Sequence, residues 1–292
     1  MIFEILNNPT LLVITGPTAV GKTDYCIQLA KKYNTAIISA DSRQFYREMH
    51  IGTAKPTVAQ LQEVPHYFIG HLSIFDYYSV SRFEEDVLQL LPTLFEKSNL
   101  VIMTGGSGLY LDAVCYGMDL LPSPEPSVRK YVTELFEKEG VLSLQKHLQL
   151  LDPDYYKIVD IANHKRLMRA IEVCLQTGKP FSSFLAATPQ KRDFEIVKYC
   201  LMRPRETLFQ RINDRVDTML ENNLLDEVKS LFPHRALNAL NTVGYKELFA
   251  YLEGRLSLEK AIENMKVNTR RYAKRQMSWF KRDQTYQYLN MD

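Results

Sequence analysis

The chain has 292 residues, of which 46% are hydrophobic and 24% are charged, and its formal net charge at pH 7 is +2. This composition predicts a globular protein with a substantial core and two subdomains, and it excludes a globally basic field. No apolar run approaches 18 residues, so no membrane-spanning helix is predicted. The N-terminal segment contains Glu4 and no basic residue, which excludes a signal peptide. The four cysteines are scattered without a C-x-x-C pair, which argues against a zinc site or a disulfide framework and favours a reducing cytoplasm.

Residues 16–23 fit the phosphate-binding pattern G-x-x-x-x-G-K-[ST]. The apolar run at 11–14 predicts a buried strand before them, and residues 24–33 have a helical rhythm after them. The glycines allow a tight turn whose N–H groups point at phosphate oxygens, and the helix N-terminus adds partial positive charge. Lys22 supplies a full charge, and the Thr23 hydroxyl can ligate Mg²⁺. The predicted phosphate-binding residues are Gly16, Pro17, Thr18, Ala19, Val20, Gly21, Lys22 and Thr23.

Further strands are predicted at 36–40, 100–103 and 195–201. Ser81 and Glu84 form a capping-box pattern, which predicts that a helix with one apolar face begins there. The alternation of strands and helices predicts the α/β class, with a P-loop parallel sheet flanked by helices.

This alternation stops near residue 118, where three prolines fall between residues 122 and 126. Residues 127–179 then look only helical, so we predict a helical insertion domain at 119–192. The P-loop α/β core is expected to comprise 1–118 and 193–292. Its C-terminal part is predicted to be a helical region, with one helix over 205–231.

Asp41 follows the second predicted strand, where parallel sheets bind ligands. Its carboxylate could act as a general base or hold Mg²⁺ through water; the alternative is a helix N-cap. The glycine cluster at 105–108 ends the third strand and is either a wall of the site or a flexible turn. Arg211 and Arg215, four residues apart, share a helix face and could neutralise a leaving diphosphate. Alternatively, they form a solvated face paired with Asp214 or Asp217.

Two regions are rich in basic residues. Residues 264–282 contain seven basic residues and no acidic one, with aromatic residues interleaved. A second cluster lies at 164–169. Binding of a phosphate backbone with base stacking explains this composition, and an ordinary surface helix is the alternative.

Seven blocks occur in an order that resembles the tRNA dimethylallyltransferase family, also called tRNA isopentenyltransferase, in its bacterial form. They are GPTAVGKT at 16–23, DSRQ at 41–44, IGTAKP at 51–56, GGSGLY at 105–110, KRLMRAIEV at 165–173, VGYKE at 243–247 and TRRYAKRQ at 269–276. The chain departs from the family pattern at His50, where Asp is common, and at Ser107 and Ser278, where Thr is usual.

The resemblance implies transfer of a dimethylallyl group from dimethylallyl diphosphate to the exocyclic N6 amine of the adenosine 3′ of the tRNA anticodon. It implies that Asp41 is the general base, that Arg215 and the P-loop bind the diphosphate, and that Thr23 holds a Mg²⁺ cofactor. The expected partners are the tRNA anticodon stem-loop and dimethylallyl diphosphate. We expect a cytoplasmic monomer, although no residue pattern decides the oligomeric state. The positions matched to tRNA contacts are Asp41, Ser42, Arg43, Gln44, Ser107, Arg129, Lys165, Arg166, Leu167, Met168, Arg169, Asn241, Thr242, Val243, Gly244, Tyr245, Lys246, Lys274, Arg275 and Lys281, with the tail stretch 274–281 as a whole.

Three other functions remain open at this point. A small-molecule P-loop kinase shares the loop and the sheet but does not need the basic aromatic tail. A non-catalytic RNA-binding protein could use a nucleotide as a switch, which would leave Asp41 and Arg215 dispensable. Prenylation of a free adenine nucleotide is the third alternative, and the long tail argues against it.

Overall fold

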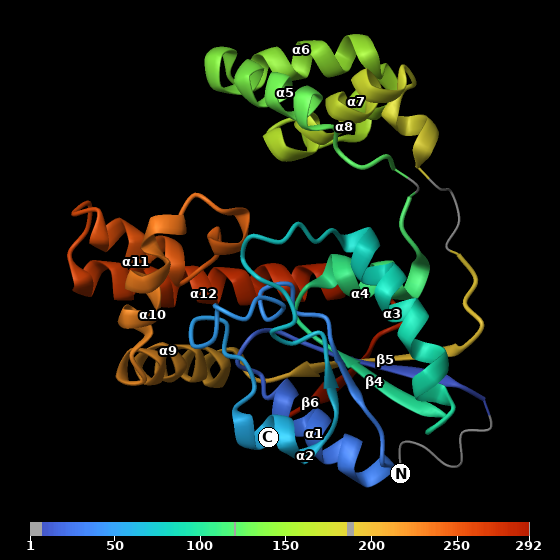
Figure 1. Ribbon diagram of the computed structural model, residues 1–292, viewed down its shortest axis with the longest axis vertical. Coiled ribbons are helices and arrows are strands. Elements are labelled where there is room, and N and C mark those ends of the chain that lie inside the picture. The colour runs from blue at the N-terminus through green and yellow to red at the C-terminus, as the bar shows by residue number, and fades with distance from the viewer. Residues whose placement is uncertain (1–7, 120, 186–189, 292) are drawn as a thin grey trace. The chain divides into compact units, whose positions relative to one another are not determined.

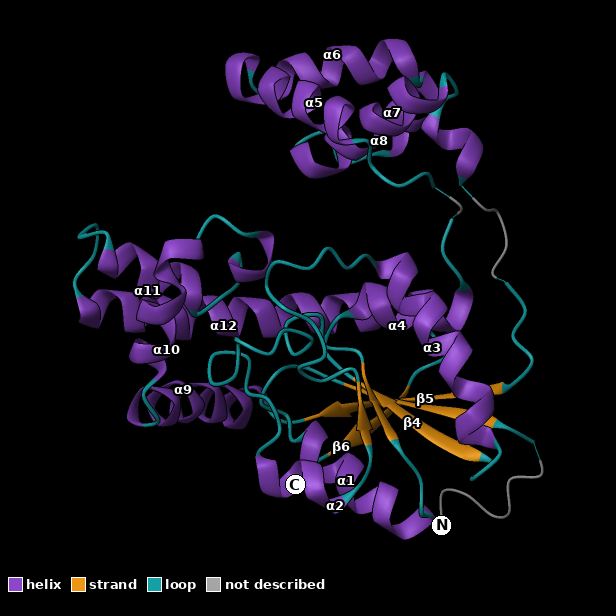
Figure 2. Ribbon diagram, in the orientation of Figure 1, coloured by secondary structure: helices purple, strands orange, loops and turns teal. Residues whose placement is uncertain are grey.

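The computed structural model describes residues 8–119, 121–185 and 190–291. Within these residues, the strands form one parallel sheet (Figures 1 and 2). Their order in the sheet is β3-β2-β4-β1-β5-β6. The strands are β1 Thr10–Thr15, β2 Ile37–Ser39, β3 His66–Tyr67, β4 Leu100–Thr104, β5 Glu195–Met202 and β6 Gln287–Asn290. The four strands predicted from apolar runs are confirmed as β1, β2, β4 and β5. The short β3 and β6 lie at the two edges of the sheet and were not predicted.

Helices cover both faces of the sheet, as the α/β prediction requires. The side chains of β1 alternate between two cores: Leu11 and Val13 belong to one, and Leu12 and Ile14 to the other. The first core includes the buried faces of α3 (Val80–Phe95) and α4 (Gly108–Tyr116). The second includes those of α1 (Lys22–Tyr33) and α9 (Arg205–Glu221). The sheet is therefore buried on both sides, and its ligand-binding edge is the carboxyl end of the strands.

Helix α3 begins two residues earlier than the capping pattern predicted. The Ser79 hydroxyl accepts a hydrogen bond from the Arg82 N–H at 3.1 Å, so Ser79 and not Ser81 is the N-cap. The Glu84 carboxylate, expected to complete the box, instead accepts a hydrogen bond from the Arg192 guanidinium at 2.6 Å.

The C-terminal region that follows β5 is helical, as predicted, but the prediction of a single helix over 205–231 is wrong. It is divided into α9 and α10 (Leu224–Leu231) by Asn222 and Asn223. Asn223 has φ +66°, a left-handed conformation that asparagine tolerates better than most residues. Helices α11 (Tyr245–Leu252) and α12 (Leu258–Phe280) follow, and α12 packs against α9, α11 and α4 (Figure 1). A short helix, α2 (Val58–Glu63), precedes β3.

The chain divides into two compact units, one spanning Gly117–Gln190 and the other made of the residues before and after it. The helices of the first are α5 Pro126–Glu139, α6 Val141–Leu151, α7 Pro153–Ile158 and α8 His164–Thr177. They enclose a core of their own that includes Val132, Leu144, Leu148 and Ile171. No helix in the described parts of the chain is long and apolar enough to cross a membrane.

Candidate active site at the P-loop

The P-loop connects β1 to α1 and takes the conformation that its glycines permit. Gly16 has φ +142°, and a Cβ there would lie 2.6 Å from the Leu201 carbonyl oxygen of β5. Gly21 has φ +110° and is the N-cap of α1. Because both positions need a positive φ, and one needs the absence of a side chain, the loop geometry depends on glycine at each. Helix α1 begins directly after the loop, and the first N–H groups of a helix have no partner within it, so the helix N-terminus adds donors for an anion bound at the loop.

The Lys22 ammonium is folded back onto the loop. It donates hydrogen bonds to the carbonyl oxygens of Gly16 at 2.9 Å and Pro17 at 3.0 Å. The pKa of Lys22 is lowered to about 8, chiefly by burial; Asp41 opposes this shift and Arg215 adds to it. The side chain is therefore a desolvated cation that an incoming anion would stabilise.

Arg211 and Arg215 of α9 both contact the P-loop. Arg211 Nε donates to the Ala19 carbonyl oxygen at 2.8 Å, and Arg215 Nη1 donates to Thr18 Oγ1 at 3.3 Å. Burial lowers the pKa of Arg215 from its ordinary value, with Arg211 as the next cause. The two aspartates proposed as partners are engaged elsewhere: Asp214 with Gln210, and Asp217 with Lys266. Arg215 therefore contacts the loop from a half-buried position and Arg211 from an exposed one, and the expected pairing with Asp214 or Asp217 is wrong.

Asp41 lies just after β2, and its Oδ1 accepts the Arg43 N–H at 3.0 Å. Residues 42–45 form a turn, so the helix N-cap alternative is wrong. The carboxylate borders two adjoining cavities that share Thr18, Arg215 and Tyr272.

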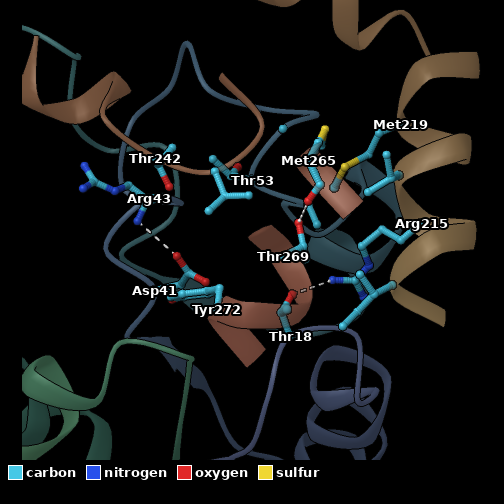
Figure 3. Close-up of a pocket in the computed structure, with 15 residues that line it drawn as sticks. Thr18, Asp41, Arg43, Thr53, Arg215, Met219, Thr242, Met265, Thr269 and Tyr272 are labelled. Carbon is cyan, nitrogen blue, oxygen red and sulfur yellow. Dashed lines mark hydrogen bonds between the residues drawn. The ribbon is translucent and has the colours of Figure 1, made fainter. Parts of the chain in front are cut away.

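These two cavities differ in chemistry. The first, which we call the phosphate cavity, is bordered by Lys22, Thr23, Arg211 and Gln276 besides the shared residues. The second, the apolar cavity, has the side chains of Ile212, Val216, Met219 and Met265 along one wall. Figure 3 shows Asp41 and Arg215 on opposite sides of the apolar cavity, with Thr18 between them. The arrangement places a polar anion-binding site and a small apolar site side by side, with one carboxylate at their junction.

Gln276 of α12 links the P-loop to the glycine cluster. Its Oε1 accepts the Thr18 N–H at 2.8 Å, and its Nε2 donates to the Gly106 carbonyl oxygen at 3.0 Å. A Cβ on Gly106 would lie 2.1 Å from Gln276 Nε2, and one on Gly105 would lie 2.4 Å from the Ala40 backbone. The cluster is therefore a close-packed wall and not a flexible turn. Gln276 was expected only as a member of the tail stretch 274–281 matched to tRNA contacts. Its contact with the P-loop was not predicted, because a glutamine on a basic helix gives no signal of its own.

The turn after Asp41 is fixed by hydrogen bonds from residues expected to contact tRNA. Ser42 donates its N–H to Ser107 Oγ at 3.0 Å, and Arg43 Nη1 donates to the carbonyl oxygens of Asn238 and Ala239, both at 3.0 Å. Gln44 Nε2 donates to the carbonyl oxygens of Thr53 and Ala54 at 3.2 and 3.1 Å. These side chains hold the turn in place in addition to any role toward a substrate.

The other expected tRNA contacts differ in exposure. Lys274, Arg275 and Lys281 are exposed on or just after α12. Asn241 and Lys246 are also exposed, and Thr242 and Val243 border the apolar cavity. In the helical insertion, Lys165 and Arg166 are exposed and Met168 is half-buried. Arg129 and Arg169 reach the buried Glu172 carboxylate at 3.1 and 3.4 Å.

Five of the positions expected to contact tRNA are buried, which contradicts a side-chain contact there: Leu167, Gly244, Tyr245, Gln276 and Phe280. The Tyr245 side chain is fully buried in the core of the C-terminal helices, as is Leu167 in the core of the insertion. Gly244 is buried next to Tyr245. Each lies in a block or stretch that contains both buried and exposed residues, and a block match does not separate the face of a helix that packs from the face that is free.

The donors that could hold Mg²⁺ are Thr23, Asp24 and Asp41, which all border the phosphate cavity. Among the described residues there is no cluster of three His, Cys, Asp or Glu side chains of the kind that would hold a metal alone. Magnesium in phosphate-handling sites is commonly held by one or two carboxylates together with substrate phosphates and water. The residues present therefore fit a Mg²⁺ ion that binds together with a diphosphate.

A sequence model of the family described as IPP transferase matches residues 44–283. The chain belongs to this family. The chain is also similar over almost its whole length to proteins named tRNA dimethylallyltransferase. It is 49% identical to tRNA dimethylallyltransferase 1 of Bacteroides thetaiotaomicron, over 97% of this chain and 92% of that protein. The one from Christiangramia forsetii is also 49% identical, over 97% of this chain and 93% of its own length.

Solved structures of the IPP transferase family share the fold. The full-length tRNA isopentenylpyrophosphate transferase from Bacillus halodurans is 35% identical with a TM-score of 0.71, covering 97% of this chain and 90% of its own. A eukaryotic dimethylallyltransferase described as acting on tRNA is 28% identical with a TM-score of 0.81, covering 97% of this chain and 74% of its own. The chain is thus a bacterial-type member of the family, and the family has the α/β architecture described above.

Proposed function

We propose that this protein transfers a dimethylallyl group from dimethylallyl diphosphate to the exocyclic N6 of the adenosine 3′ of the tRNA anticodon. In this reaction the amine nitrogen forms a bond to C1 of the allyl group, while the bond from C1 to the diphosphate oxygen breaks. The diphosphate leaves as an anion, and the amine loses one proton to the Asp41 carboxylate. The acceptor base must leave its stack to enter such a pocket.

The observation that carries this proposal is the apolar cavity next to the P-loop. An allylic diphosphate needs an anion-binding site joined to a small apolar site, which is the combination formed by Lys22 and Arg215 with Val216 and Met219. A kinase that transfers phosphate to a polar metabolite does not require an apolar wall of this kind beside the P-loop. Membership in the IPP transferase family supports the same choice.

The roles of the residues follow from their positions. The P-loop N–H groups and Lys22 bind the diphosphate, and Arg215 stabilises the charge that develops on it as it leaves. Asp41 stands at the junction of the two cavities, where it can accept the amine proton. Thr23, with Asp24 beside it, would hold Mg²⁺, which when bound neutralises diphosphate charge. Since the four cysteines are free thiols, we also propose a cytoplasmic location, and we expect a monomer.

The experiment that tests this function is incorporation of a labelled dimethylallyl group from its diphosphate into tRNA. Label in the adenosine 3′ of the anticodon supports the proposal. Label in free adenine nucleotide but not in tRNA would favour the nucleotide-prenylating alternative. No label in either, with phosphate transfer to a small molecule, would favour the kinase, and tRNA binding with neither activity would favour the RNA-binding switch.

We expect the affinity for dimethylallyl diphosphate to fall as the pH rises above about 8. The pKa of Lys22 in the free protein is about 8 because of burial, so the ammonium loses its proton in that range and the loop loses a full positive charge. A bound diphosphate anion would raise this pKa, so binding at pH 9 requires proton uptake. Isothermal calorimetry with a non-reactive analogue between pH 7 and 9.5 measures both quantities. Affinity that is constant across this range would contradict the assignment.

We expect the two basic regions to control the salt dependence of tRNA binding. Lys274 and Lys281 are exposed, and so is Arg166 of the insertion, whereas Arg270 is bonded to Asn213 at 2.6 Å. Each phosphate contact releases counterions, so Arg166→Ala, or Lys274→Ala with Lys281→Ala, should weaken binding. The salt slope should flatten by about one for each phosphate that the variant no longer neutralises.

Lys260→Ala is the control for the tail, because Lys260 lies on the first turn of α12 and pairs with Glu263. Filter binding across a salt series gives the slopes, and dimethylallyl diphosphate binding should be unchanged in every variant. Slopes that equal the wild-type slope in both test variants would show that these charges are solvated surface.

A further inference from the structure

One carboxylate anchors the loop that follows β2. Glu227 of α10 accepts hydrogen bonds from the backbone N–H groups of His50 at 2.9 Å, Ile51 at 2.6 Å and Gly52 at 2.9 Å. Its Oε1 also accepts the Tyr245 hydroxyl at 2.6 Å. The loop and the glutamate are 175 residues apart in the chain, counted from Gly52 to Glu227.

The geometry requires a negatively charged side chain at position 227. All four partners are donors, two on each carboxylate oxygen. Hydrogen bonds from N–H and O–H groups to an ionised carboxylate are about twice as strong as neutral ones. Consecutive N–H groups that converge on one anion form a concave site of the kind that binds phosphate elsewhere, and here the protein's own side chain fills it.

The anchored loop is a wall of the candidate active site. Gly52, Thr53 and Ala54 border the apolar cavity together with Asp41 and Arg215. The carbonyl oxygens of Thr53 and Ala54 also accept hydrogen bonds from Gln44 Nε2. Gln44 in turn donates its N–H to the Asp41 carbonyl oxygen at 3.0 Å. A short chain of hydrogen bonds therefore joins Glu227 through the loop to the backbone of Asp41.

Tyr245 contacts both the anchored loop and the Glu227 carboxylate. A Cβ on Gly52 would lie 2.6 Å from the Tyr245 ring, so the loop backbone lies directly against the ring. The ring is fully buried, and burial raises the pKa of the Tyr245 hydroxyl from its ordinary value, with Glu227 as the next cause. The hydroxyl is thus a permanent donor to the carboxylate.

We propose that Glu227 is a positioning residue for prenyl transfer: through its ionised carboxylate it holds residues 50–54 against the apolar cavity and so sets the place of Asp41 relative to the allyl group. This inference rests on the proposed function, since it assigns Glu227 a part in that reaction. The residue does not itself touch the substrate. The common aspartate of the family pattern is absent at position 50, and only the backbone N–H of His50 enters the anchor.

Glu227→Gln is the decisive variant. The amide replaces one oxygen with an NH₂ group, which then faces two donors in either orientation, so part of the anchor must open. Because misplacement of a reacting group by about 1 Å can cost roughly 10²-fold in rate, we expect kcat for tRNA prenylation to fall about 10- to 100-fold. The Kd values for tRNA and for a diphosphate analogue should stay within about threefold of wild type, since neither the basic regions nor the P-loop is altered.

Matched variants separate positioning from plain stability. Asp226→Asn removes a neighbouring carboxylate of α10 that is exposed and pairs with Lys229, and its kcat should equal that of wild type. Tyr245→Phe removes one of the four donors and leaves the backbone anchor, so kcat should fall by about threefold or less. Glu227→Asp keeps the charge with a shorter reach, so its kcat should lie between those of wild type and Glu227→Gln.

Amide hydrogen exchange supplies a readout that does not depend on activity. Exchange at residues 50–52 should accelerate in Glu227→Gln and not in Asp226→Asn. Faster exchange together with a lowered kcat supports the proposal. Wild-type kcat in Glu227→Gln overturns it, whether or not the melting temperature falls, and so does a change confined to tRNA affinity. If Glu227→Gln does not fold, the same comparison is made with Glu227→Asp. A wild-type protein that prenylates no tRNA would instead refute the proposed function. In that case, exchange at residues 50–52 that is the same in Glu227→Gln as in wild type would also refute the anchor.

Discussion

Asp41→Asn should slow prenyl transfer by about 10²–10⁴-fold, the usual size of a general-base effect. The acceptor amine must lose a proton as it attacks, and an amide side chain cannot take it. The substitution keeps an oxygen that can accept the Arg43 N–H, so the turn after β2 should keep its conformation. Single-turnover transfer with tRNA and dimethylallyl diphosphate both saturating measures the chemical step.

Binding of both substrates is the control for this variant, since neither should change more than about threefold. Asp214→Asn, an exposed carboxylate of α9 bonded to Gln210, should transfer at the wild-type rate. A single-turnover rate for Asp41→Asn within tenfold of wild type would remove Asp41 from the role of base.

Lys22→Ala should lower kcat/KM for dimethylallyl diphosphate by about 10²–10³-fold, as expected when one preorganised group that stabilises developing charge is lost. The ammonium is held against the loop carbonyl oxygens of Gly16 and Pro17, next to the predicted path of the leaving diphosphate. The affinity for tRNA should remain within about twofold of the wild-type value, because the basic regions and not Lys22 are proposed to bind the tRNA phosphates.

Lys32→Ala, an exposed lysine on the same helix α1, should behave like wild type in both assays. Filter binding of tRNA is measured beside steady-state transfer with the prenyl donor varied. Loss of tRNA binding with normal use of the donor would reverse the proposed division of labour between the P-loop and the basic regions.

Local signals predicted the centre of the fold well. The apolar runs of β1, β2, β4 and β5 were visible because these strands are buried on both faces, which makes each a nearly continuous hydrophobic segment. The edge strands were not visible. Strand β3 has two residues, and β6, which is Gln-Tyr-Leu-Asn, is mostly exposed, so neither shows a run or an alternation.

Part of the candidate site was predictable: Asp41, Arg211 and Arg215 were expected beside the P-loop, and they border the phosphate cavity. The glycines and lysine of the P-loop belong to a pattern with a fixed geometry, so their place was foreseen. Glu227 was not, because a glutamate on a helix looks like solvated surface until the loop 175 residues away is seen to donate to it. Tyr245 and Leu167 show the opposite error. Both were predicted to contact tRNA because they lie in matched blocks, but their side chains are buried in hydrophobic cores.

The order of the strands has a consequence for synthesis on the ribosome. Strand β1 and the P-loop are made before the other strands of the sheet, yet β1 lies between β4 and β5, and the P-loop receives Arg211, Arg215 and Gln276 from helices made later. The insertion, in contrast, is continuous from Gly117 to Gln190 and brings its own core. A nascent chain that has emerged only as far as Gln190 therefore carries all the residues of the insertion core but an unfinished sheet, since domains fold as units while they are made. The phosphate site is therefore complete only after Gln276 has been made, 258 residues beyond Thr18.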